Sequence, residues 1–120
     1  MMVTVRAPNP GRPRRALERR RYRRWPISLP VRETAPEVHV ICATSVSAGG
    51  VFCPNVAFHP VGTKVLVEID TLSGKAPVTA AARVVHSGTG EAGLGMGLEF
   101  FKPQWDLERA VSRWQCREIS

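Results

Sequence analysis

Residues 78–100 read VTAAARVVHSGTGEAGLGMGLEF, and they carry the clearest structural signal in the chain. Apolar side chains recur there at every second position, at Val78, Ala80, Ala82 and Val84 and again at Leu94, Met96, Leu98 and Phe100. A period of two is typical of β-strands that bury one face. The glycine-rich run Ser87–Gly90 between the two halves is typical of a hairpin turn. We therefore predict two antiparallel strands with their turn at residues 87–90.

The same alternation occurs four more times toward the N-terminus, between breaks that contain Gly or Pro, at residues 27–31, 38–42, 51–53 and 65–69. In the second of these segments we assign Val38, Val40 and Cys42 to the apolar face, with Cys42 in the core. Six short strands at regular spacing are typical of a small antiparallel barrel or sandwich. Closure into a barrel would leave no exposed strand edge.

The period changes after Pro103. Leu107, Ala110, Val111 and Trp114 fall at the spacing of one helical stripe. Acidic residues precede this stripe and arginines follow it, which complements the helix dipole. The pattern predicts a C-terminal helix over about residues 104–117, packed against the strands.

Positive charge is concentrated at the start of the chain. Residues 1–24 contain nine Arg, no Lys and one acidic residue, while the whole chain carries a formal net charge of +7. The remainder is therefore close to neutral. Residues 1–17 are rich in Pro, Arg and Gly, and we expect a disordered basic arm there. The planar guanidinium group matches phosphate oxygens and the guanine edge, so an anionic, nucleotide-like partner is expected.

Other classes of protein fit the sequence poorly. Three cysteines without a CxxC pair argue against a disulfide framework. No apolar run approaches the roughly 20 residues of a membrane span, and no apolar core follows the basic N-terminus as in a secretory signal. We expect a cytoplasmic protein without a membrane span.

Apparent catalytic and metal motifs also fail. Gly88–Gly93 spells GxGxxG, but an alternating strand pattern follows it instead of a helix. Ser47 has no base in the neighbouring sequence. His39 and Cys42 are three residues apart on a strand and point to opposite faces, and a set completed by Cys53 and His59 lacks zinc-site spacing. We expect no catalytic residue, no metal and no cofactor.

Two short motifs remain, and their order is more specific than either one alone. RRRYRRWPISLPVR at 19–32 contains R-x-x-x-R and leads into the first strand, and SVSAGGVF at 45–52 lies between the second and third strands. PVGTKVLVEI at 60–69, AARVVH at 81–86 and GLGMGLEF at 93–100 follow. With these stretches, residues 19–101 resemble the PilZ domain family.

The resemblance implies a six-stranded antiparallel β-barrel with a C-terminal helix over residues 18–120. It also implies a ligand, the bacterial second messenger cyclic di-GMP. The family signatures are R-x-x-x-R and [D/N]-x-S-x-x-G. Carried onto this sequence, they make Arg20 and Arg24 the clamp for phosphates and guanine edges, with Ser47 as a hydroxyl contact and Gly50 as a point of close backbone approach.

Ser45 departs from the family pattern, which has Asp or Asn at that position. A serine hydroxyl offers one uncharged oxygen in place of a carboxylate or amide acceptor for the guanine edge. Loss of such an acceptor costs roughly 1–3 kcal/mol, or about 5- to 150-fold in affinity. We therefore expect weakened binding at a site formed by Arg20, Arg24, Ser45, Ser47 and Gly50.

Three functions follow from these observations. The first is a non-enzymatic receptor for cyclic di-GMP that relays the signal to a protein partner in motility or exopolysaccharide control. The second is a degenerate domain that does not bind the nucleotide and acts as a protein-interaction adaptor, as some family members do. The third, ranked last because the folded part is neutral, is nucleic-acid binding through the arginine arm.

Overall fold

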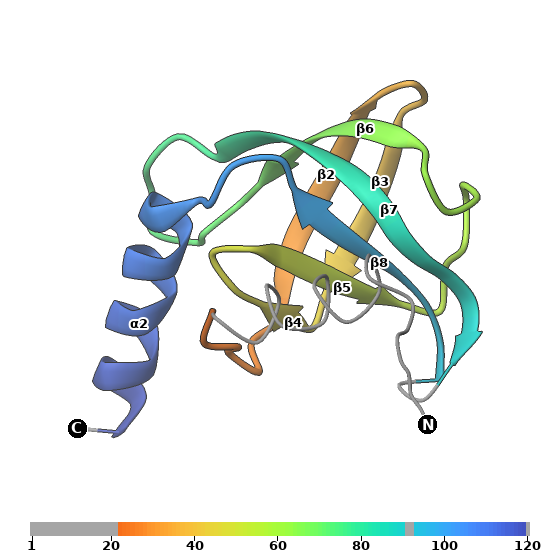
Figure 1. The fold of residues 1–120 in the computed structure, drawn as a ribbon. Coiled ribbons are helices and arrows are strands. Elements are labelled where there is room, and N and C mark those ends of the chain that lie inside the picture. The colour runs from red at the N-terminus through yellow and green to blue at the C-terminus, as the bar shows by residue number, and fades with distance from the viewer. Residues whose placement is uncertain (1–21, 91–92, 120) are drawn as a thin grey trace, which may run out of the picture.

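The computed structural model describes residues 22–90 and 93–119, with side-chain surroundings as far as Arg113. The expected disordered arm at residues 1–17 and the clamp residue Arg20 lie outside the described residues. The described chain forms seven strands and one helix (Figure 1): β2 Leu29–Ala35, β3 His39–Ala43, β4 Ser45–Val46, β5 Gly50–Pro54, β6 Lys64–Ile69, β7 Val78–Gly90, β8 Gly93–Phe100 and α2 Trp105–Ile119.

The strands form one antiparallel sheet in the order β3-β2-β6-β7-β8-β5-β4, which curls into a nearly closed barrel (Figure 1). Six strands were predicted and seven are observed, because β3, the predicted second strand, is followed after a single residue by the short strand β4. Thr44 alone separates β3 from β4, and its backbone N–H donates to the Phe52 carbonyl on β5 at 2.9 Å. β3 and β4 therefore act as one bent strand that pairs with β2 at one end and with β5 at the other.

The core confirms most of the alternation seen in the sequence. On β2, β6, β7 and β8, every second side chain points into the barrel. These buried residues include Leu29, Val31, Val65, Val67, Ile69, Ala82, Val84, Met96 and Leu98. Leu107 and Val111 on α2 are also fully buried, so the first half of the helix packs on the barrel as predicted. The helix spans two residues beyond the predicted end, and the side chain of Trp114 lies outside the described part.

The assignment of the apolar face on β3 was wrong. Val38 and Val40 are 63% and 78% exposed and Cys42 is exposed, while Ile41 and Ala43 are buried. The reason is strand register. Directly opposed residues of an antiparallel pair share a face, and Ile41 lies opposite the buried Val31. Because both faces of β3 carry apolar side chains, alternation alone could not identify the inner one.

The position of the last hairpin was also wrong. Residues 87–90 continue β7 and pair with β8 as far as Gly90 opposite Gly93, so they do not form the turn. A bulge between Val84 and His86 shifts the register within this long pair. The glycines that suggested a turn are thus strand residues.

Within the described residues, α2 is too short and too polar to cross a membrane.

Candidate functional site

The second sequence motif forms a tight corner between β4 and β5. Ser47 is buried there, and its Oγ accepts hydrogen bonds from the backbone N–H groups of Gly49 and Gly50, both at 3.1 Å. The Ser47 backbone N–H donates to the Gly50 carbonyl at 2.9 Å, and its hydroxyl donates to the same carbonyl at 3.3 Å. The hydroxyl is therefore used inside the turn and holds the corner, and a ligand contact from Ser47 stays a prediction.

Gly50 also belongs to the interior of the corner. A Cβ atom at this position would lie 2.1 Å from the Leu98 carbonyl oxygen, which belongs to the backbone of β8. The close approach expected at Gly50 is therefore an approach of two strands. Any larger residue would force β5 and β8 apart.

The first motif is fastened to this corner by the backbone. The Trp25 N–H donates to the Val46 carbonyl at 2.7 Å, and the Val46 N–H donates back to the Trp25 carbonyl at 3.0 Å. The Trp25 side chain is buried in the core, and the Arg23 guanidinium lies over its ring at 4.2 Å. This bridge gives Arg23 and Arg24 a defined position against β4.

The bridge brings the two motifs into direct contact. The exposed Arg24 side chain donates from Nη1 to the Ser45 hydroxyl at 3.0 Å. Two of the five site residues predicted from the sequence are thus hydrogen-bonded across 21 positions of the chain. Ser47 and Gly50 lie beneath them in the same turn, whereas Arg20 lies outside the described residues.

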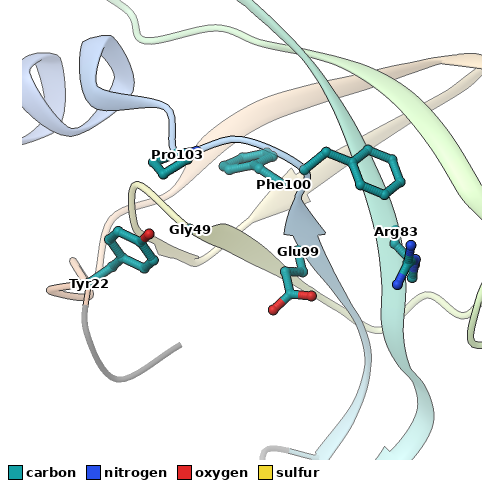
Figure 2. Close-up of a pocket in the computed structure, with 7 residues that line it drawn as sticks. Tyr22, Gly49, Arg83, Glu99, Phe100 and Pro103 are labelled. Atoms are coloured by element: carbon teal, nitrogen blue, oxygen red, sulfur yellow. The ribbon is translucent and has the colours of Figure 1, made fainter. Parts of the chain in front are cut away.

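A pocket of about 190 Å³ opens beside the corner (Figure 2). Its lining comes from the arginine-rich segment, the corner, the paired strands β7 and β8, and the segment leading to α2: Tyr22, Gly49, Arg83, Glu99, Phe100, Phe101 and Pro103. Tyr22 packs over Gly49, where a Cβ atom would be 2.5 Å from the Tyr22 ring, and its ring also contacts Trp105 with centroids 5.5 Å apart. The corner therefore forms one wall of the pocket.

Arg83 and Glu99 give the pocket opposite charges. They are opposed residues of the β7–β8 ladder, and both are half-buried. The Arg83 guanidinium lies 5.2 Å from the centre of the Phe101 ring, as a cation–π contact. Within the described part of the chain, the Glu99 side chain has no hydrogen bond or ion pair, so its carboxylate is available as an acceptor.

Sequence analysis missed these two residues. Charged side chains on a strand usually face solvent, and nothing in the local sequence relates position 83 or 99 to the corner. Only the register of β7 with β8, and of β8 with β5, places them there. The arrangement combines a half-buried guanidinium, a carboxylate acceptor and aromatic rings, which are the groups needed to hold a phosphate and a base.

The corner is also linked to the start of α2. The Ala48 carbonyl accepts from the Gln104 N–H at 2.7 Å, and the Gly49 carbonyl accepts from the Phe100 N–H at 2.9 Å. With the Tyr22–Trp105 ring contact, the site touches the helix through both backbone and side chain. A change at the corner can therefore reach α2 through directly bonded groups.

Comparison with known proteins agrees with this architecture. No curated protein matches the chain. Among solved structures, the chain is similar to the Bacillus subtilis inhibitor of motility MotI/DgrA, with a TM-score of 0.62 and 17% sequence identity over 82% of this chain. The match covers 50% of that protein, so the chain corresponds to about half of its length. At this identity the likeness establishes the fold.

The family comparison covers both motifs and the whole barrel. The PilZ domain model matches residues 18–114, which include the arginine-rich segment, the corner, all seven strands and the buried part of α2. The chain belongs to the PilZ domain family.

Proposed function

We propose that the chain is a non-enzymatic receptor for cyclic di-GMP that passes the signal to a protein partner in the bacterial cytoplasm. The observation that carries this proposal is the Arg24–Ser45 hydrogen bond, held in place by the Trp25–Val46 bridge. It joins the two halves of the binding signature beside a pocket. A family of nucleotide receptors and adaptors supplies the ligand class.

The charges and dimensions of the site support this ligand. Arg24 is exposed and can donate to a phosphate, with Arg20 as the second expected donor. The pocket, at about 190 Å³, is smaller than the roughly 300–1,000 Å³ of a typical small-molecule site, so it suits one base of the dinucleotide. A guanine presents N–H donors on its Watson–Crick edge, and Glu99 can accept them. Glu99 would then provide the acidic acceptor that is missing at Ser45.

The expected output is a change at α2. The corner is bonded to the segment before the helix, and Trp105 at its first position is 49% exposed while touching Tyr22. A ligand that displaces Tyr22 from Gly49 would alter the surface around Trp105. We propose this surface as the part read by the partner, with motility or exopolysaccharide control as the expected pathway.

Calorimetric titration with cyclic di-GMP tests the proposal. We expect binding to the parent chain and about fivefold tighter binding to Ser45→Asp, the lower end of the range expected for a restored acceptor, because Arg24 takes part of the new carboxylate's bonding. Ser73→Asp adds the same charge in an exposed loop and should leave affinity unchanged. Absence of heat in both the parent and Ser45→Asp would instead support the adaptor function.

The adaptor function is kept as a second candidate because of one observation. The position that normally carries Asp or Asn is Ser45, and its hydroxyl already accepts from Arg24. Nucleic-acid binding, ranked third, predicts an affinity for oligonucleotides that falls steeply with salt and does not need Ser47. The same titrations with an oligonucleotide at two salt concentrations separate it from the receptor function.

A further inference from the structure

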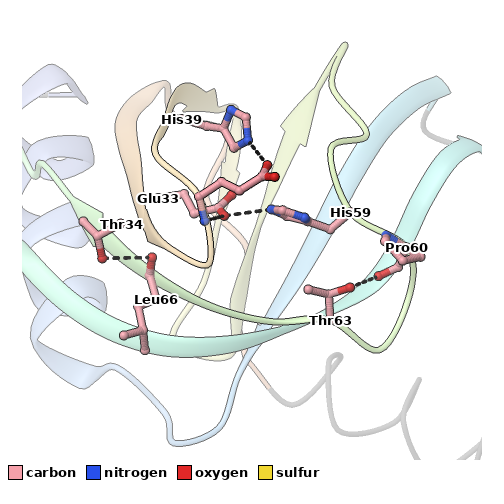
Figure 3. A network of polar contacts seen from close by, with 8 residues as sticks. Glu33, Thr34, His39, His59, Pro60, Thr63 and Leu66 are labelled. Atoms are coloured by element: carbon pink, nitrogen blue, oxygen red, sulfur yellow. Dashed lines mark hydrogen bonds and ion pairs between the residues drawn. The ribbon is translucent and has the colours of Figure 1, made fainter.

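Three side chains from different segments of the chain meet at the opposite end of β3 from the corner. Glu33 comes from β2, His39 begins β3, and His59 lies in the segment between β5 and β6 (Figure 3). One ligand atom from each lies within 4.8 Å of the others. Glu33 and His39 are opposed residues of the β2–β3 ladder and so project from the same face.

The three side chains are oriented by further contacts. Glu33 is 1% exposed, and its Oε2 lies 2.7 Å from Nε2 of the buried His59. The same oxygen accepts from the backbone N–H of Glu37 at 3.2 Å. Nε2 of His39 lies 2.8 Å from Oε1 of Glu37, and the His39 ring stacks on Phe58 with centroids 3.9 Å apart. Both imidazoles thus present Nε2 to a carboxylate oxygen.

We propose that Glu33, His39 and His59 bind a divalent transition-metal ion, with Zn²⁺ as the expected metal. Two imidazole nitrogens and one carboxylate oxygen are a donor set that zinc accepts, and the exposed Glu37 carboxylate or a water molecule completes the four ligands. The ion would take the place of the protons now shared between each histidine and its carboxylate. It would also neutralise Glu33, whose burial is costly without a positive partner.

Charge around the cluster supports a cation. With neutral imidazoles, Glu33 and Glu37 supply two negative charges, which a divalent ion balances. The Glu37 carboxylate is exposed and lies 2.8 Å from Nε2 of His39, so it is placed to join the cluster. Within the described residues, this is the one group of three or more potential ligands that lies close enough for a metal.

The sequence argument against zinc concerns a different set of residues, in which Cys42 and Cys53 accompany the two histidines. Cys53 is buried in the core and Cys42 is exposed, so the two cysteines do not join the histidines. His39 and His59 do meet, and the third ligand is a glutamate contributed by β2. A bound ion would tie the segment around His59 to the β2–β3 hairpin, about 20 Å along β3 from Ser45 by the rise of a strand.

Cobalt and zinc titrations of the chelator-treated, desalted full chain test this site. We expect one Co²⁺ per chain with the visible d–d bands of a tetrahedral site, displacement by Zn²⁺ and a Zn²⁺-dependent rise in melting temperature. Thiolate-to-cobalt absorption in the near ultraviolet should be absent, since no cysteine is a ligand. Mg²⁺ should leave the melting temperature unchanged, because it requires oxygen ligands.

Two variants and one matched control complete the test. His39→Ala removes a partly exposed ligand and should weaken Zn²⁺ binding by at least about tenfold, with a fold unchanged by circular dichroism. His59→Gln should have the same effect on Zn²⁺. His86→Ala removes the third histidine of the chain, which is hydrogen-bonded within β7, and should bind Zn²⁺ like the parent.

The proposal is overturned if the parent chain shows no tetrahedral cobalt spectrum, or if His39→Ala and the parent bind Zn²⁺ equally. Either result would make the cluster a hydrogen-bonded structural pair. Neither depends on the proposed receptor function, since cyclic di-GMP binding at the distant corner is measured separately.

Discussion

The interior and the rim of the β4–β5 corner both contain residues of the binding signature, but these residues have different structural roles. Ser47 and Gly50 lie inside, with their polar groups bonded within the turn and no space for a larger residue. Arg24 and Ser45 lie at the rim, where their side chains reach solvent and bond each other. If the proposed receptor function holds, half of the binding signature shapes the backbone and the other half is expected to contact the ligand. A change at Ser45 can therefore alter affinity while the fold is kept.

The strongest way to break this division is Gly50→Ala. The added methyl group would collide with the Leu98 carbonyl, and separating β5 from β8 should cost about 3 kcal/mol or more in unfolding free energy. Urea denaturation measures the loss. The control is Gly97→Ala, where the nearest atom to a new Cβ is 3.4 Å away and the unfolding free energy should be nearly unchanged. Equal stability of the two variants would show that the interior tolerates a side chain.

The rim is tested by Arg24→Ala. A charge-assisted hydrogen bond to phosphate is worth about 1.5–3 kcal/mol, so cyclic di-GMP affinity should fall about 10- to 150-fold with no change in melting temperature. Arg24→Lys keeps the charge but loses the fork of donors, and it should recover only part of the affinity. Arg32→Ala, an exposed arginine on β2, is the control and should bind as the parent does. A lower melting temperature for Arg24→Ala would show that Arg24 stabilises the corner and does not belong to the rim.

A matched pair of serine variants sharpens the comparison. Ser47→Ala leaves the buried N–H of Gly50 without its acceptor and should cost about 1–3 kcal/mol in unfolding free energy. Ser45→Ala should change stability by no more than about 0.5 kcal/mol, because its one described bond is at the surface. Thermal melts of both proteins under identical conditions provide the measurement. A larger loss of stability in Ser45→Ala than in Ser47→Ala would contradict the assignment of Ser47 to the interior and Ser45 to the rim.

The smallest predicted effect is a difference in reactivity between two thiols, Cys42 on β3 and Cys53 on β5. Burial raises the pKa of Cys53 to about 12, whereas Cys42 is exposed. A thiol reagent at pH 8 should therefore modify Cys42 rapidly and Cys53 only after unfolding. Cys42→Ser should lose one fast-reacting thiol and Cys53→Ser none. Loss of a fast thiol in Cys53→Ser would show that the barrel opens readily at β5.

The sequence was sufficient for the fold class because most strands have one apolar face. Alternation identified the inner residues of β6, β7 and β8, and the helical period identified Leu107 and Val111. It failed on β3, where both faces are apolar, and the order of strand pairing was needed to identify the inner face. Alternation also could not separate β3 from β4, because the single residue between them, Thr44, does not change the apolar pattern.

The candidate site was predictable only where it is local. Motif order placed Arg24, Ser45, Ser47 and Gly50 together, and the structure brings these four into one corner. Arg83 and Glu99 reach the pocket through the register of three strands, and Glu33 contacts His59 across 26 positions of the chain. Such contacts follow from tertiary pairing, which residue spacing does not encode. Which half of the motif is buried also became evident only from the turn's hydrogen bonds.

The Trp25–Val46 bridge also sets an upper limit on the distance between Arg20 and the corner. Arg20 precedes Trp25 by five residues, so covalent geometry keeps it within about 18 Å of the bridge. In the proposed receptor, a tether of this length would give Arg20 an effective concentration of the order of millimolar at a ligand already held by Arg24. The first phosphate contact then makes the second an intramolecular event. Avidity of this kind would let a site with a weakened guanine acceptor still respond to a scarce messenger.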